Sequence, residues 1–401
     1  MLSVIGVLVA FVLIVGLRLR NVDFSASILL GALVIGVTSS GPVDVFVTAF
    51  RRTLTDPTTL NLSLAVGLIT VLGYSLKETS LMSDLIEGLR AVLPSQLLLA
   101  IIPAMFGLLS MPGGALMSAP FNEPEADRMG LRPEQKTYVN VWFRHLWYWA
   151  SPINSTPILA ASLGGFGINE FLAAQLPMFL VTLAIGFVFS SRFIGRGARS
   201  PRGVRGSREV VMGLTPIVVT VLLSALGAPI WAALIVGVAI VFIIKKVSVG
   251  RSILIVRDGV RWDIVASVVS MLFFRSVVLA SGSVSALFES VTSLGIPLVA
   301  ILLVVPLLVG AISGTPTMGI GIAFPILLAL FGTSGVHLVS IIYVGIISGY
   351  LASPMHLCLV LTNSYYKSEL KSVYRYLVPS VMLLYVISVV YHLTMNGAPI
   401  V

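Results

Sequence analysis

Residues 101–122 have the sequence IIPAMFGLLSMPGGALMSAPFN, and residues 303–326 have the sequence LVVPLLVGAISGTPTMGIGIAFPI. Both stretches are apolar, and each is interrupted at its centre by proline and glycine, which end a helix and leave backbone groups free. A membrane tolerates such groups only where protein or water satisfies them. Neither arm reaches the roughly 20 residues that cross a bilayer. We therefore predict re-entrant hairpins at 95–128 and 296–333, the alternative being a surface loop between two ordinary helices.

The interruptions belong to an internal repeat. Residues 148–153 (YWASPI) match residues 350–355 (YLASPM), and the offset of about 202 residues also relates the two hairpins. Each half is predicted to hold three spans, an interfacial helix (81–92 or 284–291), a hairpin, a span broken at Ala-Ser-Pro and a final span. Because five spans is an odd number, the second half starts on the opposite face and the repeats must be inverted.

The composition places this arrangement in a bilayer. Of the 401 residues, 57% are hydrophobic and 10% are charged, against roughly 25% charged in soluble domains. We predict an all-α polytopic membrane protein with about ten transmembrane helices and two re-entrant hairpins in two inverted repeats. The predicted spans are 1–17, 24–40, 59–76, 137–165, 170–191, 210–227, 229–244, 262–280, 339–365 and 377–395, of which 137–165 and 339–365 are broken.

The basic residues predict the topology. Six arginines between Arg192 and Arg208 predict a cytoplasmic linker at 192–209, between a first repeat at 1–191 and a second at 210–401. The other short basic clusters then also fall inside, except Arg51 and Arg52, and both termini fall outside. The charge of +9 is spread over these polar breaks, so no nucleic-acid partner is expected. We expect a multi-pass protein of the cell (inner or plasma) membrane of a prokaryote.

Four interruptions converge in this arrangement, namely two hairpin tips and two broken spans. Inverted-repeat transporters bind substrate and coupling ions at such discontinuous helices, where helix N-termini attract anions and free carbonyls ligate cations. Neutral hydroxyl and amide oxygens suit Na⁺, and with N–H donors they suit a carboxylate. Alternatively, the hydroxyls only join helices. The candidate binding residues are Ser110, Gly113, Gly114, Ser151, Asn154, Ser155, Thr156, Ser313, Gly314, Thr315, Thr317, Ser353, His356, Thr362, Asn363 and Arg144.

The charged side chains favour sodium over proton coupling. All sixteen acids lie at span ends, in connections or in a hairpin arm, whereas proton-coupled transporters usually carry a carboxylate inside the membrane. Glu123 either reaches the rim of the site or marks a cytoplasmic hairpin end. Arg144 either balances an anionic substrate or snorkels to the inner surface, and Arg275 is expected to snorkel. His356 could bind substrate or a proton, or form an ordinary hydrogen bond.

An enzyme is not expected. Residues 310–314 (GAISG) loosely resemble the Gly and Ser elbow of intramembrane serine proteases, but the spacing between Gly310 and Ser313 is wrong. No zinc-protease motif or phosphate-binding glycine loop occurs in the sequence. Cys358 is the only cysteine, so neither an intrachain disulfide nor a cage of several cysteines can form. No cofactor is expected apart from Na⁺ as the coupling ion.

The layout resembles the ion transporter superfamily, and in particular the divalent anion:sodium symporters. Residues 108–120 (LLSMPGGALMSAP) and 314–325 (GTPTMGIGIAFP) are most similar to an uncharacterised prokaryotic membrane family, domain of unknown function 401. The symporters have Ser-Asn-Thr at both tips, and this chain does not, which leaves dicarboxylate binding in question. The resemblance implies an elevator mechanism, a homodimer, a carboxylate substrate, and sodium sites at Ser110, Ser151 and Asn154 and at Ser313, Thr315 and Ser353.

The sequence thus predicts a secondary active transporter in contact with membrane lipid. The favoured hypothesis is Na⁺-coupled symport of a small organic anion, either a carboxylate or an amino-acid-like molecule. One alternative is an H⁺-coupled transporter or antiporter, whose pH-dependent rate would be lost in His356→Ala or Glu123→Gln. The other is a lipid or polyprenyl-phosphate translocase, which would use the same hairpins and Arg144 and would need a lipid-sized lateral opening.

Overall fold

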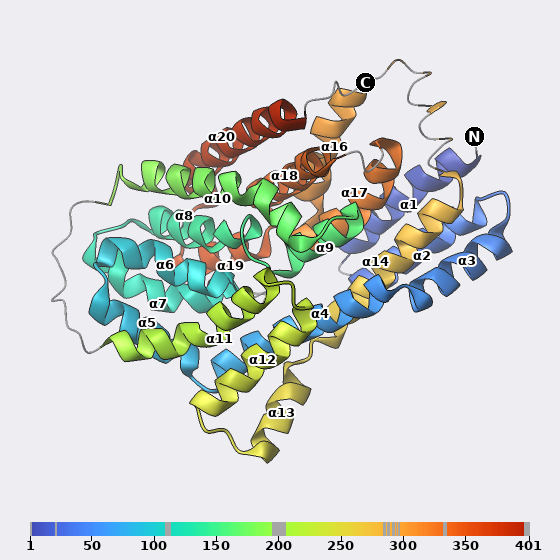
Figure 1. Ribbon diagram of the computed structural model, residues 1–401. Coiled ribbons are helices and arrows are strands. Elements are labelled where there is room, and N and C mark those ends of the chain that lie inside the picture. Colours follow the sequence, from blue (N-terminus) through green and yellow to red (C-terminus); the bar gives the residue numbers. More distant parts are fainter. Residues whose placement is uncertain are drawn as a thin grey trace.

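The computed structural model describes residues 2–20, 22–108, 114–194, 206–283, 297–331 and 335–396, together with residues 286, 289, 290, 293 and 295. Within these residues the chain forms helices and connecting turns, and no strand occurs. Figure 1 shows the helices packed side by side over the length of the molecule. The all-α prediction is therefore confirmed.

The first half follows the predicted order of elements. Its helices are α1 (Leu2–Leu19), α2 (Phe24–Val37), α3 (Pro42–Thr55), α4 (Pro57–Glu78), α5 (Leu81–Val92), α6 (Ser95–Gly107), α7 (Gly114–Arg128), α8 (Pro133–Arg144), the 3₁₀ turn η1 (Leu146–Tyr148), α9 (Ser155–Gly164) and α10 (Ile168–Ser190). Local signals set several of these boundaries. Asp56, for example, accepts a hydrogen bond from the backbone of Thr58 at 2.8 Å, and Pro57 occupies the first turn of α4.

The second half has the same order. Its helices are α11 (Ser207–Ala225), α12 (Ile230–Ile244), α13 (Val249–Gly259), α14 (Trp262–Ala280), α16 (Leu298–Ser313), α17 (Pro316–Phe331), α18 (Val336–Ala352), α19 (Leu357–Tyr366) and α20 (Leu370–Asn396). The interfacial helix predicted at 284–291 lies largely outside the described residues. The inverted relation of the two halves stays a prediction, because the matched order alone does not fix their orientation in a membrane.

Six helical segments of the described chain are long and apolar enough to cross a membrane. They are α4, α10, α11, α14, the broken span at 336–366 and α20. Shorter apolar helices occur at the first two predicted spans, in both hairpins and at α12. Two amphipathic helices, α3 and α13, were not predicted: each lies between two apolar spans and has an exposed apolar side that includes Phe50 or Ile253.

Several helices of each half pack against helices of the other half. Helix α4 packs against α12, α13 and α14, and α14 packs against α2 and α3. Within each half the first hairpin arm packs on the broken span, α6 on α8 and α16 on α18. The second arm crosses over, so that α7 packs on α19 and α17 packs on α9. In Figure 1, α8, α9, α18 and α19 lie among the hairpin helices, and α4, α12 and α14 run along the other side.

Two glycines make the contact between hairpin arm and broken span as close as it is. A Cβ on Gly107 in α6 would overlap the carbonyl oxygen of Arg144, and a Cβ on Gly310 in α16 would overlap that of Ile346. Gly107 and Gly310 are separated by the repeat offset, and so are Arg144 and Ile346. The same backbone contact is therefore built once in each half.

Candidate functional site

The first broken span places three predicted site residues in one buried turn. Residues 149–154 separate η1 from α9, and Ser151, Asn154 and Thr156 are all buried. The Asn154 amide oxygen accepts from the backbone of Thr156 at 3.0 Å, and the Ser151 hydroxyl accepts from the backbone of Ile153 at 3.3 Å. These side chains cap the free N–H groups that the break creates. Ser155 begins α9 beside them.

The second broken span contacts the tip of its own hairpin. The Ser353 hydroxyl donates to the carbonyl oxygen of Ala311 in α16 and accepts from the backbone of Met355 at 3.0 Å. At the tip, the Ser313 hydroxyl lies 3.1 Å from the Gly310 carbonyl oxygen and 3.0 Å from that of Thr315. Gly314 and Thr315 form the tip, and Thr317 lies in the first turn of α17. The structure therefore brings Ser313 and Ser353 to one hairpin–span junction.

The first hairpin tip is only partly described. Ser110 and Gly113 lie outside the described residues, and Gly114 begins α7. The end of α6 is described, and it meets the first broken span through two side chains. The Arg144 guanidinium donates to the Phe106 carbonyl oxygen at 2.9 Å, and the Trp147 indole donates to that of Ala104 at 2.8 Å. Arg144 is 7% exposed, so its charge lies in the interior, next to the hairpin.

A buried polar network joins the two halves. The Ser118 hydroxyl of α7 donates to the Asn140 amide oxygen of α8 at 2.8 Å, and the Asn140 amide donates to the Thr362 hydroxyl of α19 at 3.4 Å. All three side chains are fully buried. Of these, only Thr362 was predicted. The available signal was Asn140, a single amide in the apolar sequence VNVWF. Asn363 lies one residue on and accepts from Ser368 at 2.6 Å.

Replacing Asn140 tests how much this hydrogen-bond network stabilises the folded protein. Asn140→Leu removes both hydrogen bonds and leaves buried hydroxyls on α7 and α19, which costs about 1–3 kcal/mol for each buried group that stays unsatisfied. We expect a clearly lower thermal midpoint for the purified protein in detergent. Asn61→Leu, at an exposed position on α4, is the control and is expected to change the midpoint little. Equal midpoints for the two variants would show that the network contributes no stability.

The acidic residues of α7 contact neighbouring side chains through hydrogen bonds and ion pairs. The Glu123 carboxylate accepts from the Tyr365 hydroxyl at 2.7 Å, which links α7 to α19. Glu125 is 1% exposed and forms ion pairs with Arg128 at 3.1 Å and with Arg90 at 3.7 Å. Among the described residues, Glu125 is the only buried acid. Its charge is compensated by two arginines, as a buried carboxylate requires.

His356 lies at the N-terminus of α19, where it is fully buried. Its ring packs against that of Tyr350, with 4.0 Å between ring centroids. Neither ring nitrogen makes a side-chain hydrogen bond among the described residues, and the role of His356 stays a prediction. This histidine lies in the break of the second broken span, between α18 and α19.

A cleft of about 510 Å³ lies between α4, α9 and α12. Asn61 of α4, Ser162 of α9 and Trp231 of α12 are among its lining residues. The cleft therefore lies between the first turns of α4 and α12 and helix α9, the second part of the first broken span.

Comparisons with known proteins agree with this description. The profile of a family described as "Protein of unknown function (DUF401)" matches residues 1–394. No curated protein matches the chain. The crystal structure of the YdaH transporter of Alcanivorax borkumensis is similar in fold, with a TM-score of 0.61 at 16% sequence identity over 88% of each chain. The apolar helices and this fold identify a polytopic membrane protein.

Proposed function

Since the chain belongs to the DUF401 family of unknown function and has the fold of a known transporter, we propose that it is a secondary active transporter. The substrate that we propose is a small organic anion, a carboxylate or an amino-acid-like molecule, carried together with Na⁺. The site is the set of hairpin tips and broken spans described above. We place the protein in the cell membrane of a prokaryote, as a homodimer.

One observation carries this proposal: each hairpin's second arm packs on the other half's broken span. A substrate held at the breaks would therefore contact both halves, and the hairpins and broken spans of both halves would move with it as one part. Discontinuous helices of this kind bind ions and substrates in inverted-repeat transporters. Breaking a helix inside a membrane protein costs backbone hydrogen bonds that other groups must replace, and a purely structural role gives no reason to do so in each half.

Sodium is the favoured coupling ion because of the buried ligand types. The junction at Ser313 and Ser353 offers hydroxyl and carbonyl oxygens, which suit a hard monovalent cation. The buried carboxylate of Glu125 is already engaged in ion pairs with Arg90 and Arg128, which makes it a poor candidate for a proton relay. Symport with Na⁺ therefore fits the buried chemistry better than proton coupling.

The anion is favoured by Arg144, and an elevator motion is favoured by the cleft. Arg144 brings a positive charge into the interior beside the first break, and guanidinium groups pair bidentately with carboxylates. The cleft between α4, α12 and α9 lies where a scaffold of α4 and α12 would slide past the hairpins and broken spans. Movement of the whole hairpin-bearing part would carry the substrate with it.

The proposal is tested by uptake into liposomes. Purified protein is reconstituted with an inward sodium gradient and supplied with radiolabelled carboxylates and amino acids. We expect uptake of at least one acid above protein-free liposomes, driven by sodium and abolished when potassium replaces it. Equal uptake driven by a proton gradient in sodium-free buffer would exclude sodium coupling, and no uptake of any acid under either gradient would contradict the substrate class.

A further inference from the structure

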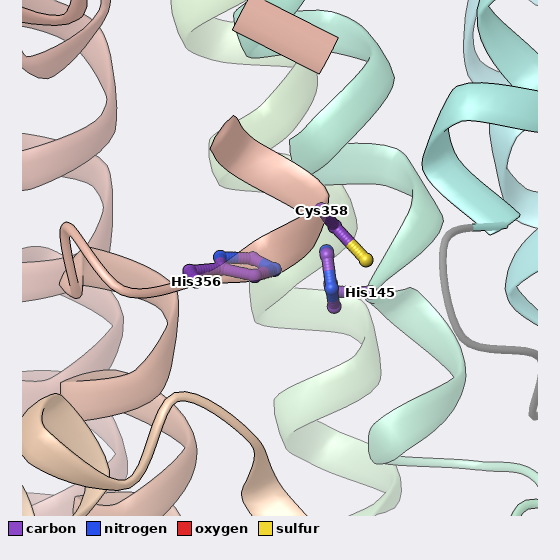
Figure 2. A group of neighbouring side chains, drawn as sticks. All are labelled: His145, His356 and Cys358. Atoms are coloured by element: carbon purple, nitrogen blue, oxygen red, sulfur yellow. The ribbon is translucent and has the colours of Figure 1, made fainter. Parts of the chain in front are cut away.

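Three side chains with metal-binding atoms meet where the two broken spans touch. His145 directly follows α8, His356 precedes α19, and Cys358 lies in the first turn of α19. Figure 2 shows His356 and Cys358 projecting from one end of α19 on the side where His145 lies. One ligand atom from each residue, two ring nitrogens and the thiol sulfur, lies within 4.8 Å of the other two. The cluster joins the first half to the second.

These ligand atoms are buried and their nitrogens are unused. His145, His356 and Cys358 are 3%, 0% and 8% exposed. Neither ring nitrogen of His356 has a hydrogen-bond partner among the described residues, and the same is true of Nε2 of His145. A buried polar atom without a partner costs about 1–3 kcal/mol. One nitrogen of each histidine and the thiol sulfur lie within 4.8 Å of one another, so a ligand bound between them would contact all three residues.

The local hydrogen bonding prepares one nitrogen for a metal. The Nδ1 atom of His145 lies 2.6 Å from the carbonyl oxygen of Val141. A carbonyl can only accept, so Nδ1 carries the proton and Nε2 presents its lone pair. This is the arrangement in which backbone carbonyls orient metal-ligating histidines. We propose that His145, His356 and Cys358 bind a soft monovalent cation of the Cu(I) class.

Charge and ligand type select this class over a divalent ion. Thiolate ligands favour soft ions such as Cu(I), and imidazole suits copper as well as zinc. The guanidinium of Arg144 already places a positive charge at the Cys358 thiol. Cu(I) binding releases the thiol proton to solvent and leaves a neutral ion–thiolate pair. Zn²⁺ would add a further net positive charge next to Arg144 in a low-dielectric interior, which is costly.

The ligand spacing suits a three-coordinate site after a small closure. With metal–nitrogen and metal–sulfur bonds of about 2.0–2.3 Å, ligand atoms of a trigonal site lie roughly 3.5–4 Å apart. The three ligand atoms lie within 4.8 Å of one another. They would have to approach by roughly 1 Å, through small side-chain rotations, to reach that spacing. The bound ion would tie α8 to α19 across the two halves. The proposal does not depend on the proposed transport function.

The repeat supplies an internal comparison. At the equivalent positions of the other half, His145 is matched by Ile347, His356 by Asn154 and Cys358 by Thr156. The fold thus accommodates an apolar residue, an amide and a hydroxyl at the corresponding junction. The three metal-binding side chains occur at one junction only, which points to a role other than packing. The replacements His145→Ile, His356→Asn and Cys358→Thr therefore copy residues that the fold already accepts.

Binding is tested with Cu(I) and the full chain in lipid nanodiscs, under anaerobic conditions with ascorbate as reductant. Cu(I) is supplied from its coloured complex with bicinchoninate, whose bleaching measures transfer to the protein. We expect one Cu(I) per chain in the wild type, and an affinity at least about tenfold lower in each of the three variants. His337→Asn, in the separate pair formed by His337 and His392, is the control and should bind like the wild type.

Three outcomes would overturn the inference. The first is undiminished Cu(I) binding by Cys358→Thr and His356→Asn. The second is displacement of Cu(I) by an equal concentration of Zn²⁺, which would assign the site to divalent ions. The third needs no variant: a copper K-edge absorption spectrum of the wild-type complex that lacks a sulfur ligand. Thermal unfolding of each variant checks that it is folded. If one variant does not fold, the comparison is made with the remaining two.

Discussion

Gly310→Ala is expected to destabilise the protein by about 3 kcal/mol or more and to abolish transport. The added methyl group would overlap the carbonyl oxygen of Ile346, a backbone atom of a neighbouring helix. Inserting atoms into a tightly packed contact typically costs 1–3 kcal/mol, and the cost is highest where backbone must move. Relief would require α16 to separate from α18, which would also pull the Ala311 carbonyl oxygen away from Ser353.

The sole cysteine provides the measurement. Cys358 is buried, so its reaction with a thiol-specific fluorescent dye during heating reports unfolding. We expect a lower midpoint for Gly310→Ala and, by the repeat, for Gly107→Ala. Gly250→Ala on α13 is the control, because nothing lies within 4 Å of its added Cβ and alanine favours a helix by about 0.5–1 kcal/mol over glycine. A midpoint for Gly310→Ala equal to that of Gly250→Ala would contradict the close packing.

The hairpins and broken spans were predictable because proline and glycine interrupt long apolar runs twice, at the same offset. Those residues act locally, on helix geometry and backbone hydrogen bonding. For this reason the bounds of α6, α16, α17 and α18 follow the predicted interruptions closely. The all-α polytopic membrane fold is likewise confirmed, since an apolar excess of this size leaves no soluble alternative.

The contacts between the halves could not be predicted in this way. Asn140 and Thr362 are distant in the sequence, and their hydrogen bond depends on how α8 packs on α19. His145 and Cys358 meet for the same reason. The sequence showed that one cysteine cannot form a multi-cysteine cage, but a mixed cluster with two histidines depends on tertiary packing. The helices α3 and α13 were missed because short amphipathic segments beside apolar spans have no strong length signal.

The predicted site residues differ in how the structure uses them. Ser151 and Asn154 bond to the backbone of their own break, whereas Ser353 reaches across to the hairpin. Both junctions nevertheless join the break to the hairpin, the first through Arg144 and Trp147 and the second through Ser353. Sodium binding at either junction remains our proposal.

Arg144→Gln is expected to raise the KM for the transported acid roughly ten- to hundredfold, with the protein still folded. A hydrogen bond to a charged group contributes about 1.5–3 kcal/mol, which corresponds to that range of affinity. Glutamine retains an amide donor for the Phe106 carbonyl oxygen, so the contact with α6 can persist while the charge is lost. Initial uptake rates in liposomes, measured over a concentration series of the acid that the wild type transports, give KM and the maximal rate separately.

Arg144→Lys is the matched control, because it keeps the positive charge and loses the planar fork of donors. If Arg144 balances an anionic substrate, the lysine variant should fall between wild type and Arg144→Gln in KM. If Arg144 instead only ties the break to α6, both variants should lower the thermal midpoint and leave KM unchanged in the fraction that transports. An unchanged KM in Arg144→Gln would therefore remove the anion-binding role and leave the backbone contact with Phe106 as the reason for a buried arginine at this position.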